Sequence, residues 1–128
     1  MMNRNYNEEE TRRIVACAKS QLLAGTPVNV LMSWGITQFA YTTWRDMPTL
    51  VVTVNGFLHR GPVFICYNGG EDLYEVYLVK NHTKEVEVVK FVKEVYADVL
   101  GDTVDRLVER GDCSLEKYYK KIEESILS

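Results

Sequence analysis

Apolar residues recur every three or four positions near the start of the chain, which is the pattern of a helix with one buried face. These residues are Ile14, Val15, Ala18 and Leu22. Asn7, with Glu10 three positions later, is typical of a capped helix start, because each side chain can bond the backbone amide of the other. Gly25 followed by Thr26-Pro27 is typical of a helix end. The sequence therefore predicts a helix from about residue 8 to residue 24.

After residue 28 the pattern changes to β-branched and aromatic residues between turn residues, which predicts an antiparallel meander. Asn55-Gly56 is the strongest hairpin signal, although a reversal at 59–61 also fits the sequence. Other turns are predicted at 46–48 and 68–72. The predicted strands are 33–44, 50–54, 57–67 with a bulge at Gly61-Pro62, 73–80 and 85–89. In the first strand, Trp34, Ile36, Ala40 and Trp44 would share one face, opposite Phe39 and Tyr41.

Two periods compete after residue 85, because residues 88–96 fit a helical stripe as well as a strand. Helical spacing is clear from Asp98, a plausible cap, to a stop at Gly111. Ser114 then caps a last predicted helix that extends to Ile126.

The predicted fold is α+β: an N-terminal helix, an antiparallel meander sheet of four or five strands, and two C-terminal helices packed on one face. About 130 residues are enough for one domain with its own core. We therefore expect a single domain over residues 1–128, with a disordered tail at 1–6. Three short helices rarely cover both faces of a sheet, so a protein partner or another copy of the chain would cover the second face.

The stretch from Ser20 to Gly70 is rich in aromatic residues and holds only three charged side chains, Arg45, Asp46 and Arg60. An ordinary antiparallel sheet solvates one face with charged residues. This window therefore predicts a sheet that is buried or that contacts another molecule on both faces. The residues expected at such an interface are Phe39, Tyr41 and Trp44.

Composition and charge exclude several classes of protein. The net charge of −3 offers no basic patch for phosphate backbones, so no nucleic acid is expected. The most apolar stretch, 50–58, is about half the length that a membrane-spanning helix requires, so no membrane contact is expected. Cys17, Cys66 and Cys113 are an odd number of distant cysteines, which indicates free thiols and a cytoplasmic location.

Candidate chemistry is sparse. His59 and His82 are the only imidazoles, which gives little material for a metal site or a nucleophile triad. A catalytic pair of Cys66 with His59 is disfavoured, because residues seven apart in a strand lie on opposite faces. The turn at 68–70 lacks the spaced glycines and the lysine of a phosphate-binding loop. We expect no catalytic residue, no metal and no cofactor.

The leading functional prediction is a non-enzymatic module that self-associates or docks a protein through its uncharged aromatic sheet. The alternative is a small-molecule or peptide-binding domain, either a binder alone or an enzyme, with a pocket near His59 and Arg60.

Three segments carry a resemblance to known proteins: 33–36, 54–61 and 72–78. They resemble small bacterial proteins of the kind carried by gut Bacteroidetes and their mobile elements. This resemblance implies a cytosolic bacterial setting, and it carries over no activity to any residue.

Overall fold

The computed structural model describes residues 6–81 and 85–111. Its first element is α1 (Glu8–Ala24), with the bounds that the sequence predicts. The capping box is formed: the Glu10 amide donates to Asn7 Oδ1 at 2.8 Å, and the Asn7 amide donates to Glu10 Oε1 at 3.3 Å. The Gly25 amide closes the helix on the Gln21 carbonyl. The predicted first helix is therefore confirmed at both ends.

A five-stranded antiparallel sheet follows, in the order of the chain, β1-β2-β3-β4-β5. The strands are β1 (Gln38–Trp44), β2 (Met47–Asn55), β3 (Arg60–Asn68), β4 (Leu73–Asn81) and β5 (Val86–Val95). The turn predicted at 68–72 and the strand that follows it are confirmed. The α+β class and the meander are likewise confirmed.

The first predicted strand begins too early. Residues 28–33 form a short helix, α2 (Val28–Ser33), and β1 starts only at Gln38. The Pro27 carbonyl accepts the first amide bonds of α2, and Trp34, which ends it, is completely buried. Burial of Trp34 outweighs the strand preference of the valines around it, because local propensity is worth only tenths of a kcal/mol per residue.

Two turns differ from their predicted positions. The β1–β2 turn consists of Arg45 and Asp46, both with positive φ (52° and 63°), so it lies one residue before the predicted turn. Such angles match the twist of a two-residue hairpin, although Asn-Gly is the usual sequence there. The β2–β3 reversal occupies residues 56–59, closed by the Gly56 amide on the His59 carbonyl. It therefore lies between the two alternatives that the sequence allows.

Residues 86–95 are a strand throughout, which settles the competing periods. The helical segment then starts as a 3-10 turn, η1 (Ala97–Val99), continues as α3 (Leu100–Asp105), and widens into a π-helical turn, η2 (Arg106–Arg110). It ends at Gly111, as predicted. The last helix predicted from Ser114 and most of the predicted tail lie outside the described residues.

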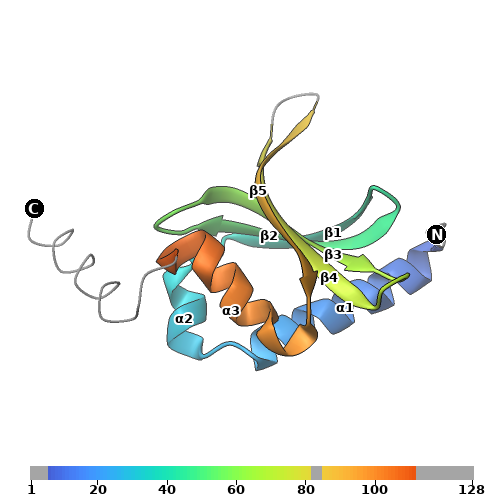
Figure 1. Ribbon diagram of the computed structural model, residues 1–128, viewed down its shortest axis with the longest axis horizontal. Helices are drawn as coiled ribbons and strands as arrows, with labels where there is room; N and C mark the ends of the chain where they lie inside the picture. The colour runs from blue at the N-terminus through green and yellow to red at the C-terminus, as the bar shows by residue number, and fades with distance from the viewer. Residues whose placement is uncertain (1–5, 82–84, 112–128) are drawn as a thin grey trace, which may run out of the picture.

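The helices α1, α2 and α3 all lie on one side of the sheet (Figure 1). The main core fills the space between these helices and the strands, and we call this side of the sheet the helix face. A second, smaller cluster lies on the opposite side, the far face. Its buried members are Met47, Phe64, Cys66, Tyr77 and Val79. The sheet therefore has an apolar core on each face, and helices cover one of them.

Candidate functional site

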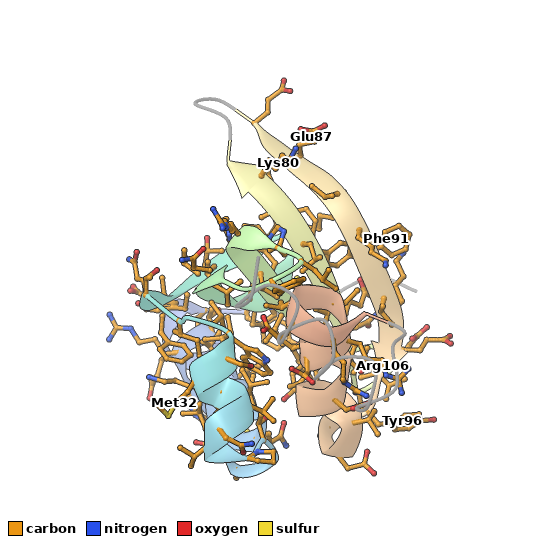
Figure 2. All side chains as sticks on the ribbon, turned by 90° about the vertical axis from the view of Figure 1, so that its left-hand side faces the viewer. Met32, Lys80, Glu87, Phe91, Tyr96 and Arg106 are labelled. Atoms are coloured by element: carbon orange, nitrogen blue, oxygen red, sulfur yellow. The ribbon has the colours of Figure 1, made fainter. Side chains whose placement is uncertain are left out.

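The exposed apolar side chains gather at one edge of the sheet. Six of the twelve large apolar residues that are exposed in the described part of the chain lie on β5 and the turn after it. They are Val86, Val89, Phe91, Val92, Tyr96 and Val99. Phe91 is 55% exposed and Tyr96 63% exposed. Figure 2 shows Phe91 on the outer side of β5 and Tyr96 beyond the end of the strand.

A hollow of about 490 Å³ lies beside β5 on the far face, and we call it the basic hollow. It is lined by Arg45, Tyr77, Val88, Val89, Lys90, Phe91 and Lys93. The Phe91 ring stacks on Tyr77 with 5.8 Å between ring centres, and the Arg45 guanidinium lies 5.4 Å from the Tyr77 ring. Three cations and no carboxylate line this hollow, so an anionic group is favoured there.

The backbone of β5 is irregular at two positions. Between the pairs Tyr74–Val95 and Val76–Val92, β5 has one residue more than β4, and the same occurs between Leu78 and Val79. Glu94 lies in the first irregularity, with φ of 58°. Extra residues of this kind bend a strand and disfavour pairing along its free edge. Side chains are therefore better placed than the backbone edge to contact another molecule.

A second hollow, of about 520 Å³, lies on the helix face between α1 and the β3–β4 turn. We call it the phenolic hollow. It is lined by Tyr6, Ile14, Cys17, Gln21, Tyr67, Gly69, Gly70, Asp72, Tyr74 and Ala97. Tyr67 donates a hydrogen bond to Asp72 Oδ1, and Tyr74 donates one to Gln21 Oε1, each at 2.5 Å. Asp72 is the one acidic residue in this lining, which includes no basic residue.

Tyr67 and Tyr74, two of the three tyrosines that line the phenolic hollow, stay protonated at neutral pH. The hydrogen bond to Asp72 raises the pKa of Tyr67 to about 12, and burial adds to this shift. Burial raises the pKa of Tyr74 to about 12. The two rings are therefore neutral donors whose protons are held by fixed acceptors.

The structure does not bring the predicted interface residues together. Phe39 and Tyr41 lie on the helix face, where Lys19 Nζ is 4.3 Å from the Phe39 ring and Arg12 Nε donates to Tyr41 Oη at 2.8 Å. Trp44 lies on the far face. Its ring makes edge-to-face contacts with Phe64 and Tyr77, at 5.3 and 4.8 Å between centres. The three aromatic residues thus contribute to two separate surfaces.

His59 and Arg60 lie where β3 begins. His59 is buried in the turn before β3, and its Nε2 is 3.0 Å from the carbonyl oxygen of Pro62 in β3. Arg60 is exposed. The turn before them is held by η2, because the Phe57 amide donates to Glu109 Oε2 and the Leu58 amide donates to the Val108 carbonyl. Neither His59 nor Arg60 lines the basic hollow or the phenolic hollow.

A close approach explains the glycine in this turn. A Cβ on Gly56 would lie 2.3 Å from Val108 Cγ1 and 2.7 Å from the Val108 carbonyl oxygen. Only glycine allows the turn to pack so closely on η2. The contacts around His59 therefore join the sheet to the helical layer.

The described residues offer little for nucleophilic or metal chemistry. Burial raises the pKa of Cys66 to about 12, so its thiol stays protonated. No group of three His, Cys, Asp or Glu side chains able to hold a metal ion occurs within residues 6–81 and 85–111. In the same ranges, no helix has the length and apolar character to cross a membrane.

Comparisons of the chain with family models, with curated proteins and with solved structures gave no match. The resemblance to small Bacteroidetes proteins stays a prediction. The function of this chain is therefore inferred from its own residues.

Sequence reasoning did not identify the residues of either hollow. A signal for the start of β5 was present, since acidic and apolar residues alternate from Glu85 to Val88, but a competing helical period over residues 88–96 obscured the rest of the strand. Tyr67, Asp72 and Tyr74 read as ordinary strand and turn residues. Their proximity to α1 arises only when the sheet packs on that helix.

Proposed function

We propose that this chain is a non-enzymatic protein-interaction module that docks a partner protein on the outer side of β5. The docking surface, which we call the β5 surface, consists of Val86, Val89 and Phe91 together with Arg45, Lys90 and Lys93. The observation that carries the proposal is the concentration of exposed apolar side chains on this one strand. Apolar patches of this kind, bordered by charged residues, are typical of protein interaction sites.

The chemistry of the basic hollow indicates what the partner presents. Its lysines and arginine favour carboxylates, and its rings favour an apolar or aromatic anchor. The Lys93 ammonium lies 5.8 Å from the Phe91 ring, so charge and apolar surface are adjacent. We therefore propose an acidic partner segment that carries apolar side chains.

Pairing of β5 with another copy of itself is less favoured. The irregularities at Val89 and at Glu94 interrupt the ladder that edge-to-edge pairing requires. Docking through side chains does not depend on that ladder.

Quantitative affinity capture from native lysate tests the proposal when the chain is compared with two variants. Phe91→Ser should lower the recovery of the partner about tenfold or more, because buried aromatic anchors dominate such interfaces. Met32→Ser is the matched control, since Met32 is 76% exposed on α2 and far from β5. It should leave recovery unchanged.

A charge reversal sharpens the test with the purified partner. Lys90→Glu with Lys93→Glu should weaken binding and should also reduce its dependence on salt. If the unsubstituted chain and the Phe91→Ser variant recover equal amounts of the partner, the proposal is contradicted. Light scattering measures whether the chain associates with itself. If the molar mass of the chain rises with concentration, and the Phe91→Ser variant keeps the monomer mass, the β5 surface serves self-association instead.

A further inference from the structure

We propose that the phenolic hollow binds an organic cation, with a methylated or quaternary ammonium group held against its tyrosine rings. This site is separate from the β5 surface, because it lies on the opposite face of the sheet. Its volume of about 520 Å³ falls within the usual range of ligand sites, about 300–1,000 Å³.

The arrangement of the rings is the first argument. Tyr67 and Tyr74 meet edge to face, with 5.7 Å between ring centres and 62° between planes. Tyr6 adds a third ring to the lining. A cation placed against several aromatic faces is attracted by the negative charge of each face, which is how aromatic cages recognise quaternary ammonium groups.

The charge of the lining is the second argument. Asp72 supplies a carboxylate, and the lining residues include no lysine, arginine or histidine. A cation entering the hollow therefore meets attraction from Asp72 and no like charge from the lining. An anion would be repelled by the same carboxylate.

The fixed geometry of the hollow is the third argument. The amides of Gly70 and Glu71 donate to Asn68 Oδ1, at 3.1 and 3.3 Å, which holds the turn that carries Asp72. A Cβ on Gly69 would lie 2.0 Å from Tyr6 Oη, so glycine permits the Tyr6 ring to lie against this turn. A site held in this way loses little conformational freedom when a ligand binds.

The test is a titration of the full chain with choline, in which calorimetry and NMR measure binding. The control ligand is 3,3-dimethylbutanol, the neutral carbon isostere of choline, which has nearly the same shape without the charge. Choline should bind about tenfold more tightly than the isostere, because only the cation is attracted by the rings and by Asp72. Equal affinities would overturn the proposal, since they would indicate an apolar cavity without charge recognition.

Two pairs of variants assign the binding to the hollow. Asp72→Asn should weaken choline binding several-fold, whereas Asp46→Asn should not; both positions are in turns with positive φ (56° and 63°), so the pair is matched. Tyr67→Leu should also weaken binding, whereas Tyr41→Leu, outside the hollow, should not. Thermal unfolding of each variant separates loss of binding from loss of fold.

Cys17 gives an independent readout, because it is exposed and lines the hollow. Choline should slow the alkylation of Cys17, measured by peptide mapping, and the isostere should not. A peptide with trimethyllysine that binds more tightly than choline would assign the cation to a protein side chain; tighter binding of choline would assign it to a free small molecule. The absence of binding by choline, by tetramethylammonium and by the peptide at millimolar concentration would overturn the proposal.

Discussion

The two faces of the sheet are both apolar, but they are buried in different ways. On the helix face, strand residues pack against α1, α2 and α3, and Trp34 is completely buried among them. On the far face, no described helix packs on the strands. There the residues bury one another, because Trp44 lies across Phe64 and Tyr77, and Phe91 stacks on Tyr77.

Among the described residues, part of an apolar sheet face is therefore buried by its own side chains, with no described helix packed on it. The seven aromatic rings in the uncharged window of the sequence differ in burial: two are buried (Trp34 and Phe64), three are partly buried (Phe39, Trp44 and Tyr67) and two are exposed (Tyr41 and Phe57). The largest concentration of exposed apolar side chains lies on β5 and the turn after it, and β4 and β5 together project beyond the other strands (Figure 1). The two hollows differ accordingly, since the helix face presents a carboxylate with phenols and the far face presents cations with rings.

The largest expected effect compares the two tryptophans. Trp34→Ala should lower the free energy of unfolding by about 3–5 kcal/mol, because it empties a fully buried site. It also removes the hydrogen bond of 2.9 Å that Trp34 Nε1 donates to Asp105. Trp44→Ala should cost less, about 0.5–3 kcal/mol, because its side chain is only partly buried. Urea denaturation measures both, and equal costs would contradict the view of the far face as the weaker core.

The second effect compares the acceptors of two tyrosine hydroxyls. Glu75 is buried on the far face and accepts from Tyr77 Oη at 2.5 Å and from Asn68 Nδ2 at 2.9 Å. Glu75→Leu should cost about 1–3 kcal/mol, because two donors lose their partner. Gln21→Leu should cost about 1 kcal/mol or less, because Tyr74 Oη at the phenolic hollow can turn to water. Urea denaturation that ranks Gln21→Leu as the more costly would refute this comparison.

The third effect is a loss of stability at high pH. The pKa values of Tyr67 and Tyr74 are about 12 in the folded chain, against an ordinary value of 10. The raised values favour the neutral phenol in the folded state, so their contribution is complete below pH 10 and is lost as pH rises through 12. Tyr67→Phe should therefore flatten the fall in stability over this window. An unchanged pH profile in denaturation experiments would argue against the Tyr67–Asp72 bond.

The smallest effect concerns the two described cysteines. Cys17 is exposed and should be alkylated in the native chain, whereas Cys66 should react only after unfolding, because burial raises the pKa of its thiol to about 12. Alkylation of Cys17 should change stability by about 0.5 kcal/mol or less. Mass spectrometry of peptides assigns the modified residue, and native labelling of Cys66 would show that the far-face core opens readily.

Local sequence signals were reliable where a backbone requirement coincided with a residue type. Asn7 and Glu10 predicted the start of α1, and Gly111 predicted the end of the last described helical turn. They were unreliable at α2 and at the Arg45-Asp46 turn, where neighbouring strands and the burial of Trp34 determine the conformation. The candidate site was harder still, because Phe39, Tyr41 and Trp44 lie on different faces and half of the exposed large apolar residues lie on β5 and the turn after it.

The sequence by itself determined the α+β class, the first helix and the meander that follows the N-terminal region, because hydrophobic period and helix caps act over a few residues. Only the tertiary structure decided how the far face is shielded, which strand remains exposed, and which side chains line each hollow. The physical reason is distance along the chain: Gln21 and Tyr74 bond across 53 positions, and Tyr77 stacks on Phe91 through the pairing of β4 with β5. Contacts of that kind depend on sheet curvature and register, which no short segment encodes alone.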